Sequence, residues 1–450
     1  MLKAYLNIFK IADLRKKILL TLGLLVIYRV GSYIPTPGVD GRALSAFFAD
    51  IAAKQGSTIF GLMDLFSGGA VSNCTIFALG IMPYISSSII LQLMTVVIPH
   101  LERLAKEGGE EGRKKINQYT RYGTVVLSLI QSFFISLWLQ NPNSFQGTII
   151  VSTPGVPFIL LVMITLTAGT AFIMWLGEQI TERGIGNGIS IIIMAGIISQ
   201  LPIALGQLWT LFSFTDPARR QIPLGYGLVM IVLFVFVVMG TILLTQGQRK
   251  IPVQYAKRVV GRKVYGGQSQ YIPLRINHGG VIPIIFASSI LMFPSTIASF
   301  SSAPWLQSFA AAFMRQEGFY NVVYMLLIIF FAYFYTAITF NPIEIADNMK
   351  KYGGFVPGIR PGRPTAEFFD NIITKITLAG SVGLAFIAVL PNIISRSLNI
   401  PFKVASFMGG TGLLIIVGVM LDTMKQVEGQ LMMHHYDGFM KKGRIKGRHY

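Results

Sequence analysis

Long apolar runs without a central charge recur along the chain, and shorter polar segments separate them. A helix needs about 20 apolar residues to cross a hydrocarbon core roughly 30 Å thick, and most of these runs approach that length. The pattern therefore predicts an all-α polytopic membrane protein. Its ten expected transmembrane helices lie near residues 18–34, 75–97, 122–140, 156–177, 188–207, 225–245, 280–300, 321–341, 373–395 and 404–421.

The stretch from residue 57 to residue 97 departs from this pattern, because two apolar pieces meet there at Ser67, Gly68 and Gly69. The first piece, residues 57–66, is too short to span and contains Asp64. At membrane depth, irregular backbone is tolerated only inside protein or beside a water-filled cavity. The pattern thus predicts a short helix in the mouth of a cavity. A helix that lies on the surface and only packs there stays open as the alternative.

Ten spans divide into two groups of five, and an odd number of spans per group gives the groups opposite orientations in the membrane. We therefore expect an inverted repeat of two five-helix halves. Pro83 and Pro283 occupy matching spans, where each is expected to bend its helix by removing a hydrogen bond. The predicted division is residues 1–17 as the N-terminus, 18–207 as the N-terminal half with a short helical segment at 57–73, 208–224 as an external linker, 225–421 as the C-terminal half, and 422–450 as a tail.

The formal net charge of +19 comes from 38 Lys and Arg residues against 19 Asp and Glu residues, and this surplus cannot reside inside lipid. Most of the cations fall in the N-terminus, in alternate loops and in the tail after Asp422, which predicts that both termini are cytoplasmic. Arg29 is the one cation inside a span. It lies close enough to the outer end of that span for its side chain to reach the interface.

Two of the predicted cytoplasmic loops are long and basic. The first, residues 246–277, alternates cations with Val, Tyr and Ile, and its turn residues at Gly261 and Gly266 predict a protruding, hairpin-like finger. In the second, residues 342–375, prolines stiffen the chain around Arg360. We interpret both loops as docking surfaces for an acidic partner or nucleic acid. The ordinary excess of cations in cytoplasmic loops is the alternative, and it explains the charge but not the length or the turns.

Patterns typical of catalysis or metal binding are missing from the sequence. The chain has no Walker-type phosphate loop, no HExxH motif and no Cys/His cluster with metal-ligand spacing, so we predict neither an enzyme nor a cofactor. An ion-coupled carrier shares the inverted repeat and the broken helix, but the acidic residues lie at span ends or in loops, which weighs against a coupling site. An inert scaffold for ribosomes is a third interpretation.

Several long phrases resemble the SecY family of protein-translocation channels: SGGA, FALGIMPYISSSIILQL, QYTRYGT, WLGEQITERGIGNGISIII, GQRKIPVQYAKR, GVIPIIFASSI, FNPIEIADNMKK, FVPGIRPG and GGTGLLIIV. The resemblance implies two inverted halves around a central pore, with a short plug helix that blocks the closed channel from outside. It also implies the function: a central subunit of the Sec translocon that passes unfolded secretory polypeptides across the inner membrane and releases transmembrane segments sideways into lipid.

The resemblance further implies roles for particular residues. The pore ring matches six isoleucines: Ile81, Ile85, Ile189, Ile193, Ile285 and Ile415. The plug includes Phe60, Met63, Leu65, Phe66, Ser67, Gly68 and Gly69. The lateral gate lies between the second and third spans and the seventh and eighth, with Gln92 and Phe293 on its inner faces. Helical spacing supports part of the ring, since Ile81 and Ile85 share one helix face. Spacing alone, however, favours isoleucines that face lipid.

The partners that the resemblance implies are the SecA ATPase, the translating ribosome with its RNA, the small membrane subunits SecE and SecG, unfolded precursor polypeptides and membrane lipid. Docking of the ATPase and the ribosome is assigned to the cations of the two basic loops: Arg249, Lys250, Lys257, Arg258, Arg262, Lys263 and Arg360.

Overall fold

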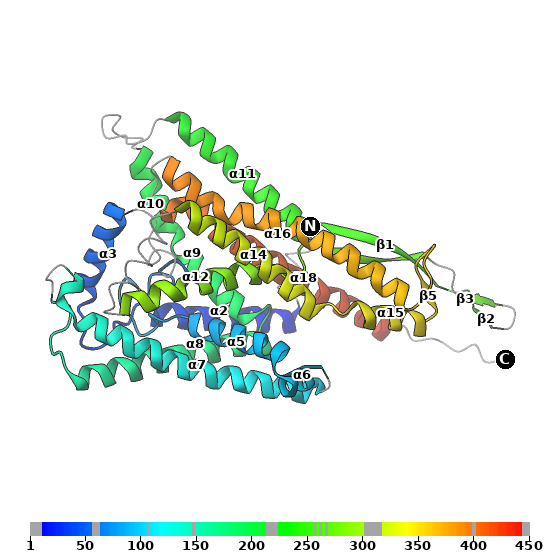
Figure 1. Ribbon diagram of the computed structural model, residues 1–450, viewed down its shortest axis with the longest axis horizontal. Coiled ribbons are helices and arrows are strands. Elements are labelled where there is room, and N and C mark those ends of the chain that lie inside the picture. The colour runs from blue at the N-terminus through cyan, green and yellow to red at the C-terminus, as the bar shows by residue number, and fades with distance from the viewer. Residues whose placement is uncertain are drawn as a thin grey trace. The chain divides into compact units, whose positions relative to one another are not determined.

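The structure is a computed structural model that describes residues 11–55, 64–106, 108–145, 149–212, 224–255, 258–260, 263–265, 269–300, 317–397 and 402–442. The chain forms two compact units: unit 1 consists of Met1–Leu208 and Val419–Tyr450, and unit 2 of Trp209–Gly418. Helices make up most of both units (Figure 1). The predicted all-α polytopic class is thereby confirmed.

Among the described residues, seven helices are long and apolar enough to cross a membrane. The number rises to eight if α5 (Met82–Val97) and α6 (Pro99–Lys106), which meet at an angle of 105°, count as one broken span. The expected total of ten spans stays a prediction.

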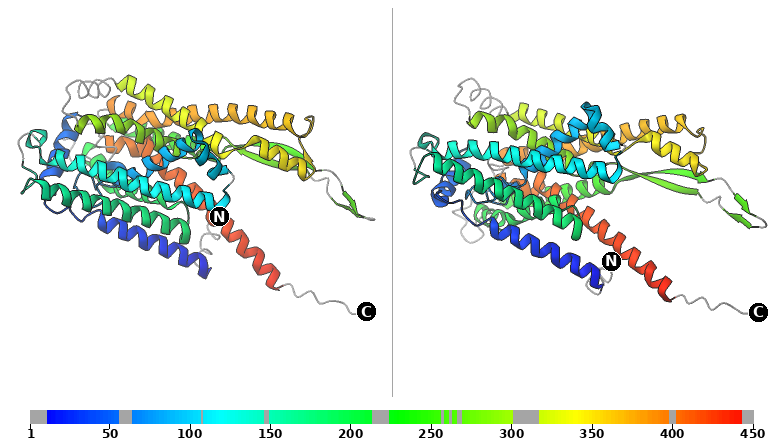
Figure 2. Two further views of the ribbon diagram at one scale, coloured as in Figure 1. Left: turned by 60° about the horizontal axis from the view of Figure 1, so that its bottom comes forward. Right: turned by 90° about the horizontal axis from the view of Figure 1, so that it is seen from below.

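The helix α8 (Val156–Arg183) is the central element of unit 1. It packs against α2 (Ala12–Gly31), α7 (Gly109–Gln140) and α9 (Gly188–Ser199). Figures 1 and 2 show α2, α7 and α8 running side by side. Asn187 is the N-cap of α9, because its side chain accepts the backbone N–H groups of Ile189 and Ser190. The helix α10 (Leu201–Phe212) follows α9 after one residue.

One face of α7 consists of small side chains at every fourth position. Thr120, Thr124, Ser128, Ser132 and Ser136 are all buried there. Each of these hydroxyls donates to a carbonyl three or four residues earlier in α7, so the stripe brings no unsatisfied polar atom into the interior. Small residues allow neighbouring helices to approach closely. Ser87 Oγ of α5 accordingly reaches Thr120 O at 2.9 Å, and Ser132 Oγ lies 3.5 Å from Thr167 Oγ1 of α8.

Short backbone pairings connect loops of unit 1 that lie far apart in the sequence. α3 (Gly41–Gln55) follows a loop in which Pro35 pairs with Thr75 and Val39 with Val151. A single 3₁₀ turn, η1 (Pro142–Phe145), lies beyond the end of α7. Buried side chains from these loops and helices, including Leu44, Phe145 and Phe158, form one apolar cluster beneath the pairings.

The two bends expected at Pro83 and Pro283 are absent, because both prolines lie in the first turns of helices instead. Thr75 pairs with Pro35 and residues 76–81 form turns, so the prediction of one helix from residue 75 to residue 97 was wrong. α5 starts at Met82 and holds Pro83 in its first turn, where the missing N–H costs no helical hydrogen bond. Pro283 is likewise the second residue of α12 (Ile282–Phe300). The predicted bends at Pro83 and Pro283 were therefore wrong.

Unit 2 contains a second set of packed helices. α14 (Glu317–Thr339) contacts both α12 and α16 (Arg363–Ser397), while α11 (Leu224–Gln246) contacts α16 and α17 (Phe402–Gly409). The last helix, α18 (Thr411–Lys442), begins in unit 2 and ends in unit 1.

A small antiparallel sheet stands at one end of unit 2. β1 (Gln248–Tyr255) pairs with the whole of β4 (Ser269–Arg275), and β5 (Gly354–Phe355) joins the other edge of β1. Two short strands, β2 (Arg258–Val260) and β3 (Lys263–Tyr265), pair farther along the same hairpin. The predicted finger is therefore confirmed, and Figures 1 and 2 show it extending beyond the helices of unit 2.

The sheet is fastened to the helices by alternate apolar residues of β1. Ile251 and Val253 are buried in a cluster with Met349 of α15 (Pro342–Lys351) and Phe369 of α16. The loop predicted at residues 342–375 thus contains more helix than expected. Asn341 accepts the backbone N–H groups of Ile343 and Glu344, and this cap starts α15 directly after α14.

The small-residue face of α7 yields a prediction about stability. Ser128 is 1% exposed, so Ser128→Leu should push neighbouring helices apart and lower the free energy of unfolding by about 1–3 kcal/mol. Val126 of the same helix is 55% exposed, and Val126→Leu should change stability little. Thermal unfolding in detergent compares the two variants. Equal unfolding temperatures would show that α7 does not pack closely through this face.

Candidate functional site

The segment predicted as the plug, residues 57–73, is described from Asp64 onward, and Phe60 and Met63 lie outside the described residues. Internal hydrogen bonds to Asp64 hold its described part together. The Asp64 carboxylate accepts the backbone N–H of Ser72 at 3.0 Å, and the Asp64 carbonyl accepts that of Gly69 at 2.9 Å. Gly68 and Gly69 have φ angles of 68° and 91°, a left-handed conformation that glycine adopts without strain. Residues 64–67 are helical and residues 68–73 form turns, so the described part of the segment is compact rather than an extended loop.

Two side chains of α2 hold this turn from one side. The Arg29 guanidinium donates to Gly68 O at 2.7 Å, and the buried Tyr28 hydroxyl donates to Ser67 O at 3.4 Å. Arg29 also donates to the Tyr33 hydroxyl at 2.8 Å and lies 4.6 Å from the centre of that ring. The sequence led us to expect that Arg29 would reach for the membrane interface, yet it binds a backbone carbonyl of the plug segment.

The C-terminal end of α9 holds the same turn from a second side. A Cβ atom added at Gly68 would lie 3.0 Å from Gly196 Cα, and one added at Gly69 would lie 2.6 Å from Gln200 Nε2. A side chain at Gly68 would therefore press on the backbone of α9, and one at Gly69 would require the Gln200 side chain to move. Leu65, Phe66 and Ser67 are buried, and Phe66, Ser67 and Ile81 line one small cavity. The plug segment and one of the predicted pore positions thus border the same cavity within unit 1.

The six isoleucines of the predicted ring are divided between the two units. Ile81 and Ile85 lie at the start of α5 and are buried, while Ile193 of α9 is buried and Ile189 is half-buried. In unit 2, Ile285 of α12 and Ile415 of α18 are buried as well. Because the ring draws on both units, its assembly stays a prediction.

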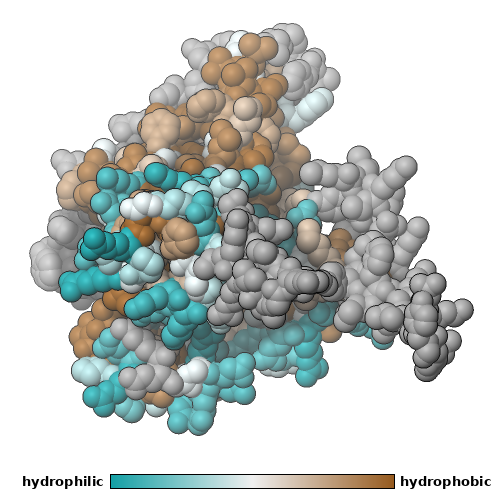
Figure 3. All heavy atoms as spheres, turned by 90° about the vertical axis from the view of Figure 1, so that its right-hand side faces the viewer, coloured by the Kyte–Doolittle hydropathy of each residue, from teal (hydrophilic) through white to brown (hydrophobic). Residues whose placement is uncertain are grey.

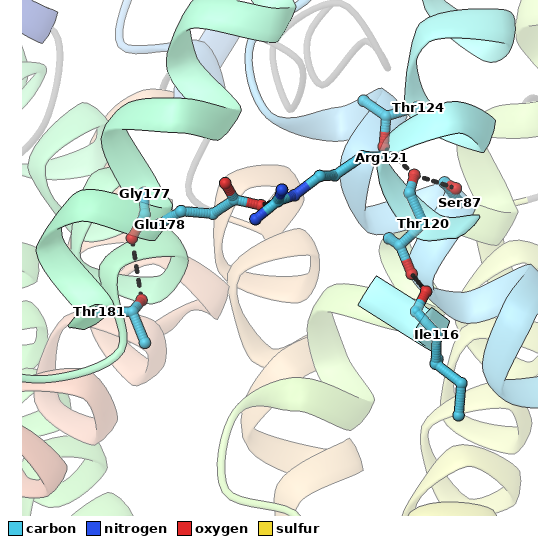
Figure 4. Close-up of polar contacts among 8 residues, drawn as sticks. All are labelled: Ser87, Ile116, Thr120, Arg121, Thr124, Gly177, Glu178 and Thr181. Atoms are coloured by element: carbon cyan, nitrogen blue, oxygen red, sulfur yellow. Dashed lines mark hydrogen bonds and ion pairs between the residues drawn. The ribbon is translucent and has the colours of Figure 1, made fainter. Parts of the chain in front are cut away.

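Polar contacts in unit 1 involve α5 and α7, the helices predicted to form one side of the gate. Figure 4 shows Arg121 of α7 reaching across to Glu178 of α8, with Nε of the arginine 2.7 Å from the carboxylate. Neither residue was singled out from the sequence, although both are charges at the margins of apolar runs, in QYTRYGT and WLGEQITER. Gln92 of α5 donates to Ser88 Oγ at 3.1 Å and is half-buried. Phe293 belongs to α12, but its side chain lies outside the described residues.

The basic loops place some of the predicted docking residues at the surface of unit 2. Arg249 and Lys250 lie at the exposed start of β1, and Arg360 is exposed on a tight loop where Thr365 Oγ1 donates to its carbonyl at 2.8 Å. Arg258 and Lys263 lie on the paired strands β2 and β3, whereas Lys257 and Arg262 are outside the described residues. Figure 3 faces this end, and hydrophilic residues gather on it.

One titratable group lies at the base of the sheet. His278 follows β4 and packs edge-on against Phe340. Burial, with a smaller effect from the neighbouring Arg275, lowers the pKa of His278 below its usual value. The ring therefore stays neutral at pH 7 and packs as an aromatic side chain. Among the described residues, no group of three His, Cys, Asp or Glu side chains could hold a metal ion.

Comparison with known proteins gives consistent results over nearly the whole chain. The family model SecY matches residues 75–424. The chain is 49% identical to the protein translocase subunit SecY of Streptomyces scabiei, over 98% of this chain and 100% of that protein. It is 46% identical to the subunit of the same name from Escherichia coli strain K12, over 97% of this chain and 96% of that protein.

Solved structures share the fold at lower sequence identity. The structure described as that of a protein conducting channel superposes with a TM-score of 0.64 at 18% identity, covering 92% of this chain and 91% of the other. Sec61 in a canine ribosome-channel complex from the endoplasmic reticulum superposes with a TM-score of 0.60 at 17% identity, with the same coverage.

The contacts of the plug segment predict how firmly it is held, and the single cysteine offers a reporter. Cys74 follows the segment directly and is 3% exposed. Arg29→Met removes the charged hydrogen bond to Gly68 O, so maleimide should label Cys74 about five- to tenfold faster. Arg42→Met, which changes an exposed arginine on α3, is the matched control and should leave labelling unchanged. Equal labelling rates in the two variants would mean that Arg29 does not hold the segment.

Proposed function

The chain belongs to the SecY family of protein-translocation channels, and from this membership we propose how its parts move polypeptides through the cytoplasmic membrane. It is a subunit of a protein-conducting translocon and a multi-pass membrane protein. We place it in the inner membrane with both termini cytoplasmic, as the distribution of Lys and Arg predicts. The carrier and scaffold interpretations have no support from this family.

The seating of the plug segment is the observation that carries the proposed gating. Its turn meets α2 through Arg29 and Tyr28 and meets α9 at Gly196. The hydrogen bonds that hold the turn come from side chains of α2, so the segment can leave without unfolding the helices beneath it. Displacement opens the outer side of the pore. The glycines supply the conformations that such a tight turn needs.

The pore ring is the second barrier in this proposal. Branched apolar side chains at Ile81, Ile85, Ile189, Ile193, Ile285 and Ile415 bind no particular sequence, and they can mould around any passing chain. A narrow apolar constriction also tends to dewet, which blocks ions when no polypeptide fills it. The burial of Ile85, Ile193, Ile285 and Ile415 away from bulk solvent supports this role.

The lateral gate is proposed between α5 and α7 on one side and α12 and α14 on the other, with Gln92 and Phe293 facing the pathway. Moving into lipid lowers the free energy of an apolar segment of about 20 residues that reaches this gate, but not that of a polar segment. The gate therefore sorts segments by their own transfer free energies. The protein itself supplies no chemical energy for secreted chains.

Energy and targeting must come from cytosolic partners, and the basic loops are the proposed docking surfaces. We assign the finger cations Arg249, Lys250, Lys257, Arg258, Arg262 and Lys263, together with Arg360, to binding of the SecA ATPase and the translating ribosome. The projection of the finger beyond the helices and the exposure of Arg249, Lys250 and Arg360 support this assignment. A ribosome-bound Sec61 shares the fold. SecE and SecG are the proposed membrane subunits.

Resting ion conductance tests the pore ring. Ile415→Asn places an amide in a dry constriction, where an amide without a partner costs roughly 1–3 kcal/mol. Water entry relieves this cost, so the variant should conduct ions at rest about tenfold more than the unchanged protein in planar bilayers. Ile415→Leu keeps the volume and the apolar character and should stay closed. Equal, near-zero currents from both well-folded variants would remove Ile415 from the pore.

Export driven by the ATPase tests the docking loop. Arg360→Glu reverses an exposed charge on a tight loop, so membrane insertion and folding should be normal while export into proteoliposomes falls strongly. A loss larger than about fivefold would indicate a buried or bidentate contact in the complex, since an exposed pair is worth less. Lys114→Glu, at an exposed lysine of α7, is the control and should export normally. Normal export by the Arg360 variant would refute the assignment.

A further inference from the structure

Gln200 is a polar residue in the middle of an apolar span. It is the single residue between α9 and α10, which together form one candidate span of 25 residues from Gly188 to Phe212. The residue is 2% exposed, so its amide is buried within the protein. A polar side chain in such a place is costly unless it finds hydrogen-bond partners. Its presence therefore calls for a reason.

The usual structural reasons for a buried glutamine do not apply to Gln200. Its backbone N–H donates to Ile197 O at 3.0 Å and its carbonyl accepts the Ala204 N–H at 3.0 Å, so the break between the helices needs no side-chain cap. The buried Oε1 atom accepts no hydrogen bond from the residues that the structure describes. A buried amide oxygen without a donor destabilises the arrangement that buries it, because the same oxygen is hydrogen-bonded in water.

The amide of Gln200 lies against the glycine turn of the plug segment. A Cβ atom at Gly69 would be only 2.6 Å from Gln200 Nε2, so the glycine backbone and the amide are in direct contact. Arg29 and Tyr28 hold the same turn from α2 by donating hydrogen bonds to its carbonyls at 2.7 and 3.4 Å. Two groups therefore favour the seated position of the plug segment, and one buried group beside it opposes that position.

We propose that Gln200 is a positioning residue that weakens the seating of the plug segment, so that the segment is released readily. This inference rests on the proposed function. When the plug segment leaves, water enters the outer side of the pore and supplies the hydrogen bonds that the amide lacks in the seated state. The free-energy difference between the seated and displaced states is thereby reduced. Gln200 thus acts in the opposite direction to Arg29, although both residues act on the same turn.

Maleimide labelling of Cys74 in the full-length protein tests this effect. Gln200→Met keeps the length and the unbranched shape of the side chain but removes both polar atoms, so labelling should become about tenfold slower. This direction is opposite to that expected for Arg29→Met, and the double variant should label at a rate between those of the two single variants. Gln118→Met makes the same chemical change at an exposed position of α7 and should leave labelling unchanged.

Export kinetics and thermal unfolding separate this role from simple packing. With Gln200→Met, export of a precursor should begin after a longer lag, whereas its rate should be unchanged once the precursor occupies the pore. Unchanged labelling with a higher unfolding temperature would restrict Gln200 to helix packing, and faster labelling would show that its amide stabilises the seated turn. Either result overturns the inference. If labelling slows but the lag stays the same, the inference about Gln200 stands and the proposed gating by the plug segment fails.

Discussion

Backbone that leaves the helical path inside a membrane protein must find its hydrogen-bond partners within the protein, and the segment between α2 and α5 obeys this constraint. The carbonyls of Ser67 and Gly68 accept bonds from Tyr28 and Arg29. Nearer α5, Cys74 O accepts the Thr36 N–H and Ile34 O accepts the Ile76 N–H. The late start of α5 depends on these partners, since residues 75–81 could otherwise satisfy their polar groups only as helix. A turn satisfied by a few side chains can also be released by losing them, which suits a plug.

Unit 1 contains two kinds of helix surface, one lined by small hydroxyl residues and one by branched apolar residues, and they serve different purposes. The hydroxyls on α7 bond within their own helix, so this face is small, dry and suited to close packing. Ile85 in the first turn of α5 and Ile193 on α9 are branched and apolar, which suits a constriction that must exclude ions and release any chain it holds. The Arg121–Glu178 ion pair joins α7 to α8 beside this packed face.

The sequence predicted the membrane class from long apolar runs, the basic finger from cation-rich turns and the glycine turn from paired glycines. Each of these patterns is explained mainly by one physical requirement, so the prediction did not depend on contacts elsewhere in the chain. It misplaced the start of α5, since Pro83 is compatible with both a bent helix and a first turn, and only the pairing with residues 34–36 decides between them. It could not assign Arg29 or Glu178 a partner, because both contacts join segments far apart in the chain. The family resemblance supplied the ring residues, which spacing alone would have left facing lipid.

The central claim is that a translocating polypeptide passes the branched side chains of α5, α9 and α12. Photo-crosslinking groups placed at Ile85, Ile193 and Ile285 in turn, with a precursor stalled halfway through export, test it directly. Ile90 and Ile198 lie on α5 and α9 but are 42% and 41% exposed, so they serve as controls outside the ring. Adducts with the precursor should form from the three ring positions and not from the two controls. Equal adduct yields from all five positions, or none from the ring, would contradict a pore lined by these isoleucines.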